Sequence, residues 1–291
     1  MPNTSLKEFT KPIYSLNIGG KLLEIQQPKI MAIVNITTDS FWNGNCATSN
    51  SDIQKQVEKH LRDGAHIIDL GGYSTRPGAL NIPSDQEICR LLEAVNAAKD
   101  VDPNVIISID TFRSEVVEKV YDNHGAFIVN DISGGTIDEN IIAITAQCKL
   151  PYIIGHIKGT PQNMAQNATY DQPIINALLQ HFTVQINKSH QAGIKDLIID
   201  PCFGFAKTLT HNYSLLKHFN QLKVLGYPML AALSRKSMIY KPLETTPSDA
   251  LIGTAALHFE ALRQGAQILR VHDTKEAVQI TKLFYEYENA N

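Results

Sequence analysis

Eight short apolar runs recur along the chain, and a polar residue able to do chemistry follows each of them. The runs are residues 30–34, 67–68, 105–109, 127–129, 152–154, 197–199, 228–233 and 268–269. The residues that follow them are Asn35, Asp69, Asp110, Asn130 with Asp131, His156, Asp200, Ser234, and Arg270 with His272. A parallel barrel gathers the carboxyl ends of its strands around one active-site mouth. The pattern therefore predicts an α/β fold, a (β/α)8 TIM barrel.

Helical patterns lie between these runs. Ser51 with Gln54, and Ser84 with Glu87, have the spacing of a capping box that opens a helix. Four glycines stand near expected helix C-termini, just before the next apolar run: Gly64, Gly125, Gly193 and Gly265. Short strands alternating with helices require right-handed crossovers between parallel strands. No linker-like segment interrupts the series, so we expect one domain over residues 1–291.

A doubly wound open sheet is the rival fold. It needs a glycine-rich phosphate turn after its first strand, and residues 35–39 read Asn-Ile-Thr-Thr-Asp instead. Residues 1–29 form a preface to the barrel, in which two extended stretches within 13–25 flank Gly19 and Gly20. Because glycine accepts a positive φ, this is a hairpin signal. We expect an N-terminal β-hairpin that closes the bottom of the barrel and carries no chemistry.

Composition narrows the classes of partner. Apolar residues make up 43% of the chain, enough for a sizeable core. Lys and Arg number 26 against 29 Asp and Glu, with no basic block, which argues against nucleic acid or an anionic membrane as partner. Residues 1–10 lack a signal-peptide pattern, and no apolar run approaches the roughly 20 residues that cross a bilayer. These features predict a cytoplasmic protein that acts on small molecules.

The cysteines carry little signal. Cys46, Cys89, Cys148 and Cys202 stand far apart without a C-x-x-C pair. We expect four reduced thiols, with a zinc or disulfide set as the alternative.

Four of the strand-end residues suit a flat heterocycle. Asp110, Asn130 and Asp200 follow the third, fourth and sixth runs, and Lys236 lies just after the seventh. Two carboxylates, an amide and an ammonium around one cavity match a ring with many N–H donors and ring-nitrogen or carbonyl acceptors. The alternative for each aspartate is that it caps the following helix or pairs with a lysine structurally.

A second group suits an anion. Arg76 follows the second run, and Arg270 and His272 alternate in the last, so both point to one side of a strand. Arginine matches phosphate oxygens, and the end of strand eight is a favoured phosphate site in such barrels. The alternative is that Arg270 and His272 are ordinary surface residues without a binding role. Asn35 and Asp39 are oxygen donors suited to Mg²⁺ held jointly with substrate phosphates.

Other matches carry less weight. Lys207 and Thr208 lack the glycine spacing of a phosphate-binding loop. The ten histidines show no paired-ligand spacing, so we expect no tight transition-metal site, and we interpret His156 as structural.

Taken together, these segments resemble the dihydropteroate synthase family. The matching blocks are Met31–Phe41 (MAIVNITTDSF), Asp69–Gly78 (DLGGYSTRPG), Ser108–Thr111, Asn130–Gly134, His156–Met164 (HIKGTPQNM), Asp200–Thr208 (DPCFGFAKT), Ser234–Ser237 and Arg270–Asp273. They keep the family's order from about residue 28 to the end. The resemblance implies a TIM-barrel transferase, usually a homodimer, that joins 4-aminobenzoate to 6-hydroxymethyl-7,8-dihydropterin pyrophosphate in folate biosynthesis and is a target of sulfonamides.

The resemblance also assigns roles to residues of this chain. Asp110, Asn130, Asp200, Lys236 and Arg270 would bind the pterin. Asn35, Arg76, Arg270 and His272 would bind the pyrophosphate, and Asn35 would hold Mg²⁺ as the cofactor. Phe41, Thr75, Arg76, Pro77, Phe205 and Ser234 would form the aminobenzoate pocket. Asp39, Arg76 and Lys236 would take part in catalysis.

Several positions depart from the family pattern. Thr38 replaces a usual proline, Tyr73 stands where glutamate is commoner, Ile157 where methionine is frequent, and Cys202 and Ala206 where glycine is frequent. None of these removes an expected pterin or phosphate ligand. The competing hypotheses are a methyltransferase domain with the same barrel and a non-catalytic pterin-binding paralogue.

Overall fold

A parallel barrel forms the centre of the molecule. The computed structural model describes residues 14–36, 50–75 and 81–290. Within these ranges the wall consists of β3 (Lys29–Asn35), β4 (Ile67–Gly71), β5 (Ile107–Asp110), β6 (Ile128–Asp131), β7 (Tyr152–Ile154), β8 (Leu197–Ile199), β9 (Leu230–Ala231) and β10 (Ile268–Val271). Their order is β8-β7-β6-β5-β4-β3-β10-β9, and a parallel bridge between Ile199 and Met229 joins the two ends. The predicted (β/α)8 barrel is confirmed.

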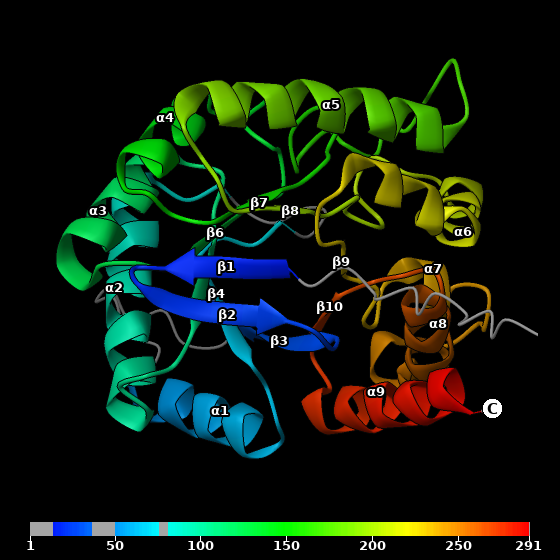
Figure 1. Ribbon diagram of the computed structural model, residues 1–291, viewed down its shortest axis with the longest axis horizontal. Coiled ribbons are helices and arrows are strands. Elements are labelled where there is room, and N and C mark those ends of the chain that lie inside the picture. Colours follow the sequence, from blue (N-terminus) through cyan, green and yellow to red (C-terminus); the bar gives the residue numbers. More distant parts are fainter. Residues whose placement is uncertain (1–13, 37–49, 76–80, 291) are drawn as a thin grey trace, which may run out of the picture.

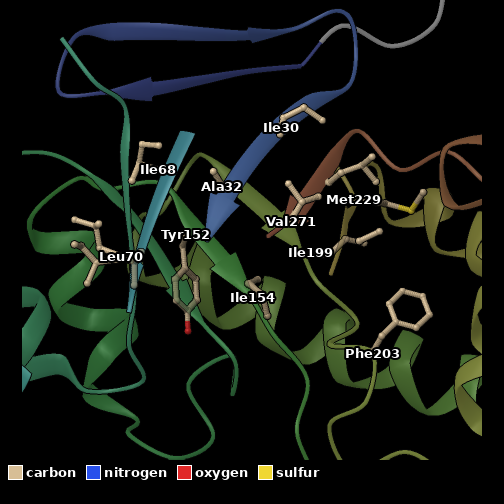
Figure 2. Packing of buried hydrophobic residues seen from close by; sticks show 14 of the residues in the cluster. Ile30, Ala32, Ile68, Leu70, Tyr152, Ile154, Ile199, Phe203, Met229 and Val271 are labelled. Carbon is tan, nitrogen blue, oxygen red and sulfur yellow. The ribbon is translucent and has the colours of Figure 1, made fainter. Parts of the chain in front are cut away.

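Helices surround this wall (Figure 1). They are α1 (Asn50–Arg62), α2 (Ser84–Val101), α3 (Ser114–His124), α4 (Asn140–Gln147), α5 (Ile174–Ala192), α6 (Leu209–Lys217), α7 (Ser237–Tyr240), α8 (Leu251–Arg263) and α9 (Thr274–Asn289), with 3₁₀ turns η1 (Phe219–Leu225) and η2 (Pro247–Asp249). Outward-facing strand residues such as Ile68, Leu70 and Ile154 pack against the buried faces of the helices (Figure 2). This apolar shell holds the strands, and hence their carboxyl ends, in place.

The predicted helix starts need correction. Ser51 is the second residue of α1, and Ser84 is the first residue of α2, after the N-cap Pro83, which makes no side-chain cap bond. Neither serine is an N-cap. For α2 the physical reason is that Glu87 is fully buried and bonds to Thr111 and Arg113 instead of to its own helix terminus. The four glycines predicted near helix C-termini are confirmed in that role, since all four have positive φ, from 75° to 103°.

The predicted hairpin is present and closes one end of the barrel. β1 (Tyr14–Ile18) pairs antiparallel with β2 (Lys21–Ile25). Its turn contains Gly19 at φ 61°, where an added Cβ would lie 2.7 Å from Ala126. The apolar hairpin residues pack on side chains near the start of the barrel strands: Leu16, Ile18, Leu23 and Ile25 on Met31, Ile67, Ile128, Ile153, Ile198, Leu230 and Ile268. Figure 1 shows the hairpin lying across the barrel.

The expectation of four reduced thiols is wrong in part. Cys148 and Cys202 are free thiols, whereas Cys89 is disulfide-bonded. The distance between cysteines along the chain excludes a local C-x-x-C pair but not a pairing that folding creates. Across the described residues, no helix combines the length and the apolar character that crossing a membrane requires.

Candidate active site

A charged cluster lies at the carboxyl ends of β4, β5, β6 and β10. Arg270 donates through Nε to Asp69 Oδ2 at 2.6 Å and through Nη2 to the carboxylate of Asp110. Asn130 donates through Nδ2 to Asp69 Oδ1 at 3.2 Å. Asp69 therefore joins Asn130 to Arg270, and Arg270 in turn joins Asp110, although these residues lie far apart in the sequence.

Strand register explains this arrangement. Asn35 pairs with Gly71, Gly71 with Asp110, and Asp110 with Asn130, so residues at one level of four neighbouring strands face one space. Gly71 keeps that space open, because a Cβ there would lie 3.4 Å from Asn35 Oδ1 and 3.7 Å from Asp110 Cβ.

The pKa values of Asp110 and Arg270 depend on the ion pairs within this cluster. Asp69 is fully buried, and the Arg270 side chain is 15% exposed. Burial raises the pKa of Asp110, and the Arg270 guanidinium opposes this rise. Burial alone lowers the pKa of Arg270, but the carboxylates of Asp69 and Asp110 outweigh it and raise that pKa. Arg270 therefore stays cationic in the site.

Asp200 and Lys236 are two further charged residues at the same mouth, and each influences the pKa of the other. Asp200, just after β8, accepts a hydrogen bond from the backbone N–H of Cys202 at 2.7 Å. Burial raises the pKa of Asp200, and the Lys236 ammonium opposes this rise. Burial lowers the pKa of Lys236 to about 8. The Lys236 ammonium donates to the carbonyl of Phe203 and lies 4.9 Å from the centroid of the Phe205 ring.

Two candidate anion ligands lie nearer the solvent. His272 is exposed, and its backbone N–H and Nδ1 lie 3.2 Å and 3.1 Å from Ser234 Oγ. Asn35 is also exposed, at the end of β3. The mouth thus has a buried layer of paired charges and an outer layer of polar side chains.

The alternative role of Asp110 as a helix cap is wrong. The N-cap of α3 is Arg113, and the Asp110 carboxylate bonds to Arg270. Asp200 does not cap the next helix either, because Thr208 caps α6 with its own capping box. Arg235, in contrast, is structural: it forms a bidentate pair with Asp273 at 2.8 Å on each arm.

The structure places Thr75 and Phe205, both half-buried, on the loops after β4 and β8. Asp39, Phe41, Arg76 and Pro77 lie outside the described residues, as does the departure at Thr38.

The sequence patterns predicted no role in the site for Asp69 or Glu87. Asp69 ended an apolar run like the other candidates, so the signal for it was present. Glu87 was interpreted as a capping residue. It instead accepts from Thr111 Oγ1 at 2.7 Å and from Arg113 at 2.8 Å, which joins α2 to the end of β5.

Tyr73 makes hydrogen bonds and an aromatic contact within the loops around the mouth. Its hydroxyl accepts from Gln162 at 2.6 Å and donates to Asn81 Oδ1 at 3.2 Å. Its ring packs edge-on against Phe112 with the centroids 5.2 Å apart. The tyrosine that replaces the commoner glutamate therefore ties the loop after β4 to the loop after β7.

Comparison with known proteins assigns the family. Residues 31–272 match the family described as pterin binding enzyme. A dihydropteroate synthase from Synechocystis sp. is 40% identical over 257 residues, which cover 87% of this chain and 88% of that protein. The Escherichia coli dihydropteroate synthase is 38% identical over 266 residues, covering 91% and 93%. The chain belongs to the dihydropteroate synthase family of pterin-binding enzymes. It is accordingly a transferase, and the resemblance seen in the motifs is confirmed.

Solved structures of the family agree. The Yersinia pestis dihydropteroate synthase, with a sulfonamide drug complex, superposes with a TM-score of 0.88 at 34% identity, covering 95% of this chain and 100% of that one. The Xanthomonas albilineans dihydropteroate synthase with 4-aminobenzoic acid gives 0.86 at 30% identity, covering 95% and 99%. The same organism's enzyme in complex with 7,8-dihydropteroate gives 0.83 at 27% identity, covering 96% and 100%.

Proposed function

We propose that this protein condenses 6-hydroxymethyl-7,8-dihydropterin pyrophosphate with 4-aminobenzoate, giving 7,8-dihydropteroate and pyrophosphate. The observation that carries the proposal is the convergence of Asp110, Asn130 and Arg270 at one barrel mouth, where Asp69 joins Asn130 to Arg270 and Arg270 joins Asp110. The 4-aminobenzoic acid and 7,8-dihydropteroate bound to the Xanthomonas albilineans relative support it.

The pterin is proposed to bind in the buried layer. Asp110 and Asp200 accept from ring and amino N–H groups, and Asn130 and Lys236 complete the hydrogen bonding. Arg270 covers the ring and also reaches the pyrophosphate. Ionised groups in a buried site make hydrogen bonds about twice as strong as neutral ones, which favours one orientation of the ring.

The pyrophosphate is proposed to bind in the outer layer, through Asn35, Arg76, Arg270 and His272. In the described ranges, no three His, Cys, Asp or Glu side chains are grouped so as to hold a metal. Mg²⁺ nevertheless fits, because it takes oxygen donors and often shares one or two protein ligands with substrate phosphates. The exposed amide of Asn35 is proposed as one such donor, and Asp39 as a second. When bound, Mg²⁺ supplies positive charge that stabilises the departing pyrophosphate.

The chemistry proposed is a largely dissociative substitution. The bond between the pterin methylene carbon and the pyrophosphate oxygen breaks, and the ring delocalises the cation that remains. Arg76, Arg270 and Lys236 stabilise the anion that leaves. The amine nitrogen of 4-aminobenzoate then attacks the methylene carbon and loses a proton. That nitrogen is already nucleophilic, so the reaction needs no strong general base.

The second substrate is proposed to lie against Phe41, Thr75, Arg76, Pro77, Phe205 and Ser234. This is also the pocket in which sulfonamides would compete. Asp39 is proposed to take part in catalysis, on a segment that keeps water from the cation during the reaction.

The direct test is turnover. Purified protein with both substrates and Mg²⁺ should release pyrophosphate and form dihydropteroate, and leaving out 4-aminobenzoate should abolish the second product. A folded sample that binds the pterin pyrophosphate without turnover would indicate a non-catalytic paralogue. Preference for methyltetrahydrofolate would indicate a methyltransferase domain.

We also propose that the enzyme is a cytoplasmic homodimer, as is usual in the family. Light scattering should then give twice the chain mass.

A further inference from the structure

Lys207 is a buried ammonium that the proposed reaction does not use. It is 7% exposed, and its Nζ lies 2.9 Å from the carbonyl oxygen of Phe205, 3.2 Å from that of Cys202 and 3.3 Å from that of His156. A fourth acceptor, Nδ1 of His156, lies at 3.0 Å. This buried ammonium has three carbonyl groups and an imidazole as partners. Because they belong to both loops, it holds the loop after β8 against the loop after β7.

The loop that Lys207 holds contains two unfavourable backbone conformations. Cys202 has φ 52° and Ala206 has φ 46°, in the left-handed region, and both carry a Cβ. Each such residue is less favourable than in the right-handed form, because its Cβ crowds the following carbonyl oxygen. The ammonium binds the carbonyl of Cys202 itself and the carbonyl of Phe205, the residue just before Ala206. Its bonds therefore offset strain at both places.

The two phenylalanines of this loop are held differently. Phe203 is fully buried and packs on Phe219 with ring centroids 5.8 Å apart, so the core fixes it. Phe205 is half-buried. Its carbonyl is bound by Lys207, and the next carbonyl, that of Ala206, accepts from the Tyr170 hydroxyl at 2.9 Å. Lys207 and Tyr170 thus bind the backbone at Phe205 and at the residue that follows it.

We infer that Lys207 is a positioning residue for 4-aminobenzoate, because it holds Phe205 at the mouth of the barrel. This inference rests on the proposed function, which places Phe205 in the aminobenzoate pocket. Asp200 contacts this loop through its carboxylate, which accepts from the N–H of Cys202, but its backbone has an anchor outside the loop, because its N–H donates to the carbonyl of Ile154 at 2.9 Å. Loss of Lys207 should accordingly affect the second substrate much more than the pterin.

The test compares Lys207→Met with the wild-type enzyme. The expected result is a KM for 4-aminobenzoate raised by about tenfold, which corresponds to one lost charge-assisted hydrogen bond. The dissociation constant for the pterin pyrophosphate, measured by calorimetry, should stay within about twofold. Lys99→Met is the matched control, because Lys99 Nζ also donates to a carbonyl, that of His124 at 2.8 Å, but outside this cluster.

The variant Ala206→Gly supplies a rescue test, with the KM for 4-aminobenzoate as its readout. Gly adopts positive φ without strain, so Ala206→Gly added to Lys207→Met should recover part of the lost KM. If the single variant does not fold, the double variant is compared with Ala206→Gly alone, and a KM raised at least threefold is expected.

An unchanged KM in a folded variant overturns the inference, and so does an equal loss of pterin affinity. Absence of turnover in the wild-type enzyme, in contrast, would contradict the proposed function itself.

Discussion

The two ends of this barrel differ in character although the same strands form both. At the closed end, Ile67, Ile128, Ile198 and Ile268 pack under the hairpin. Two residues further along each strand stand Asp69, Asn130, Asp200 and Arg270. Because alternate residues of a strand point to the same side, each of these isoleucines and its polar partner share the barrel interior. A step of two residues, roughly 6.6 Å, separates a dry apolar layer from a layer of paired charges.

The two layers are stabilised in different ways. Apolar side chains gain free energy simply by leaving water. Buried charges lose free energy on leaving water and recover it only through partners, which explains why Arg270 has two carboxylates around it. Substitutions at the closed end should therefore change stability, whereas those at the open end should change binding and turnover.

Leu16→Ala should have the largest effect on stability. Leu16 is 1% exposed in the hairpin core, and truncation of such a residue costs about 2–5 kcal/mol of unfolding free energy. Urea unfolding checks this, and pterin affinity in the folded variant should be unchanged. Leu22→Ala, in the same hairpin but 64% exposed, is the control and should change little. Similar losses of unfolding free energy in both variants would contradict the role of the hairpin core in stability.

Asp200→Asn should weaken pterin binding by more than about 1.5 kcal/mol, because a charge-assisted acceptor in a buried site is lost. Titration calorimetry with the pterin pyrophosphate measures this. Asp196→Asn is the control, since Asp196 lies just before the same strand and accepts from the backbone of Asn17 in the hairpin. An unchanged dissociation constant in Asp200→Asn would exclude it as a pterin ligand.

Arg76→Ala should lower kcat by about tenfold, the size of one lost charge-assisted interaction, with a smaller change in pterin affinity. The reason is that this side chain is assigned to the leaving group and the second substrate. Steady-state kinetics combined with pterin binding separates the two effects. Arg263→Ala, half-exposed on α8, serves as the control. Equal losses of kcat and affinity would mean that Arg76 binds the pterin instead.

Pterin affinity should fall at alkaline pH. Burial lowers the pKa of Lys236 to about 8, so its ammonium is present below that pH and is lost above it. At pH 8.5 the dissociation constant should be about fourfold higher than at pH 6.5. The arginine of Lys236→Arg keeps its charge over this range, so the dissociation constant of this variant should not change with pH. A dissociation constant that still rises would mean that another group causes the dependence.

The barrel was predictable from the sequence because its signal is repeated: each strand is apolar, and each is followed by a polar residue. The hairpin was predictable because Gly19 and Gly20 mark its turn. The candidate pterin residues were found by the same rule, and their meeting at one mouth is a direct result of parallel strands.

Other features depend on tertiary structure and left no local trace. Ser84 and Glu87 have a capping pattern, yet the carboxylate is used by Arg113 on a different element. In the sequence, Lys207 belongs to a segment that lacks the glycine spacing of a phosphate-binding loop. Its acceptors on the loop after β7 are about 50 residues away along the chain. The disulfide at Cys89 likewise follows from folding and not from spacing.

Among the described residues, the hairpin covers one end of the barrel interior, and the charged mouth lies at the other end. In the proposed binding mode, a pterin on Asn130 and Asp200 would lie beneath its own pyrophosphate, held at the solvent-facing Asn35 and His272. The pyrophosphate would then have to depart before the newly formed product could leave the barrel. Closure of one end by the hairpin thus sets the order of product release at the other.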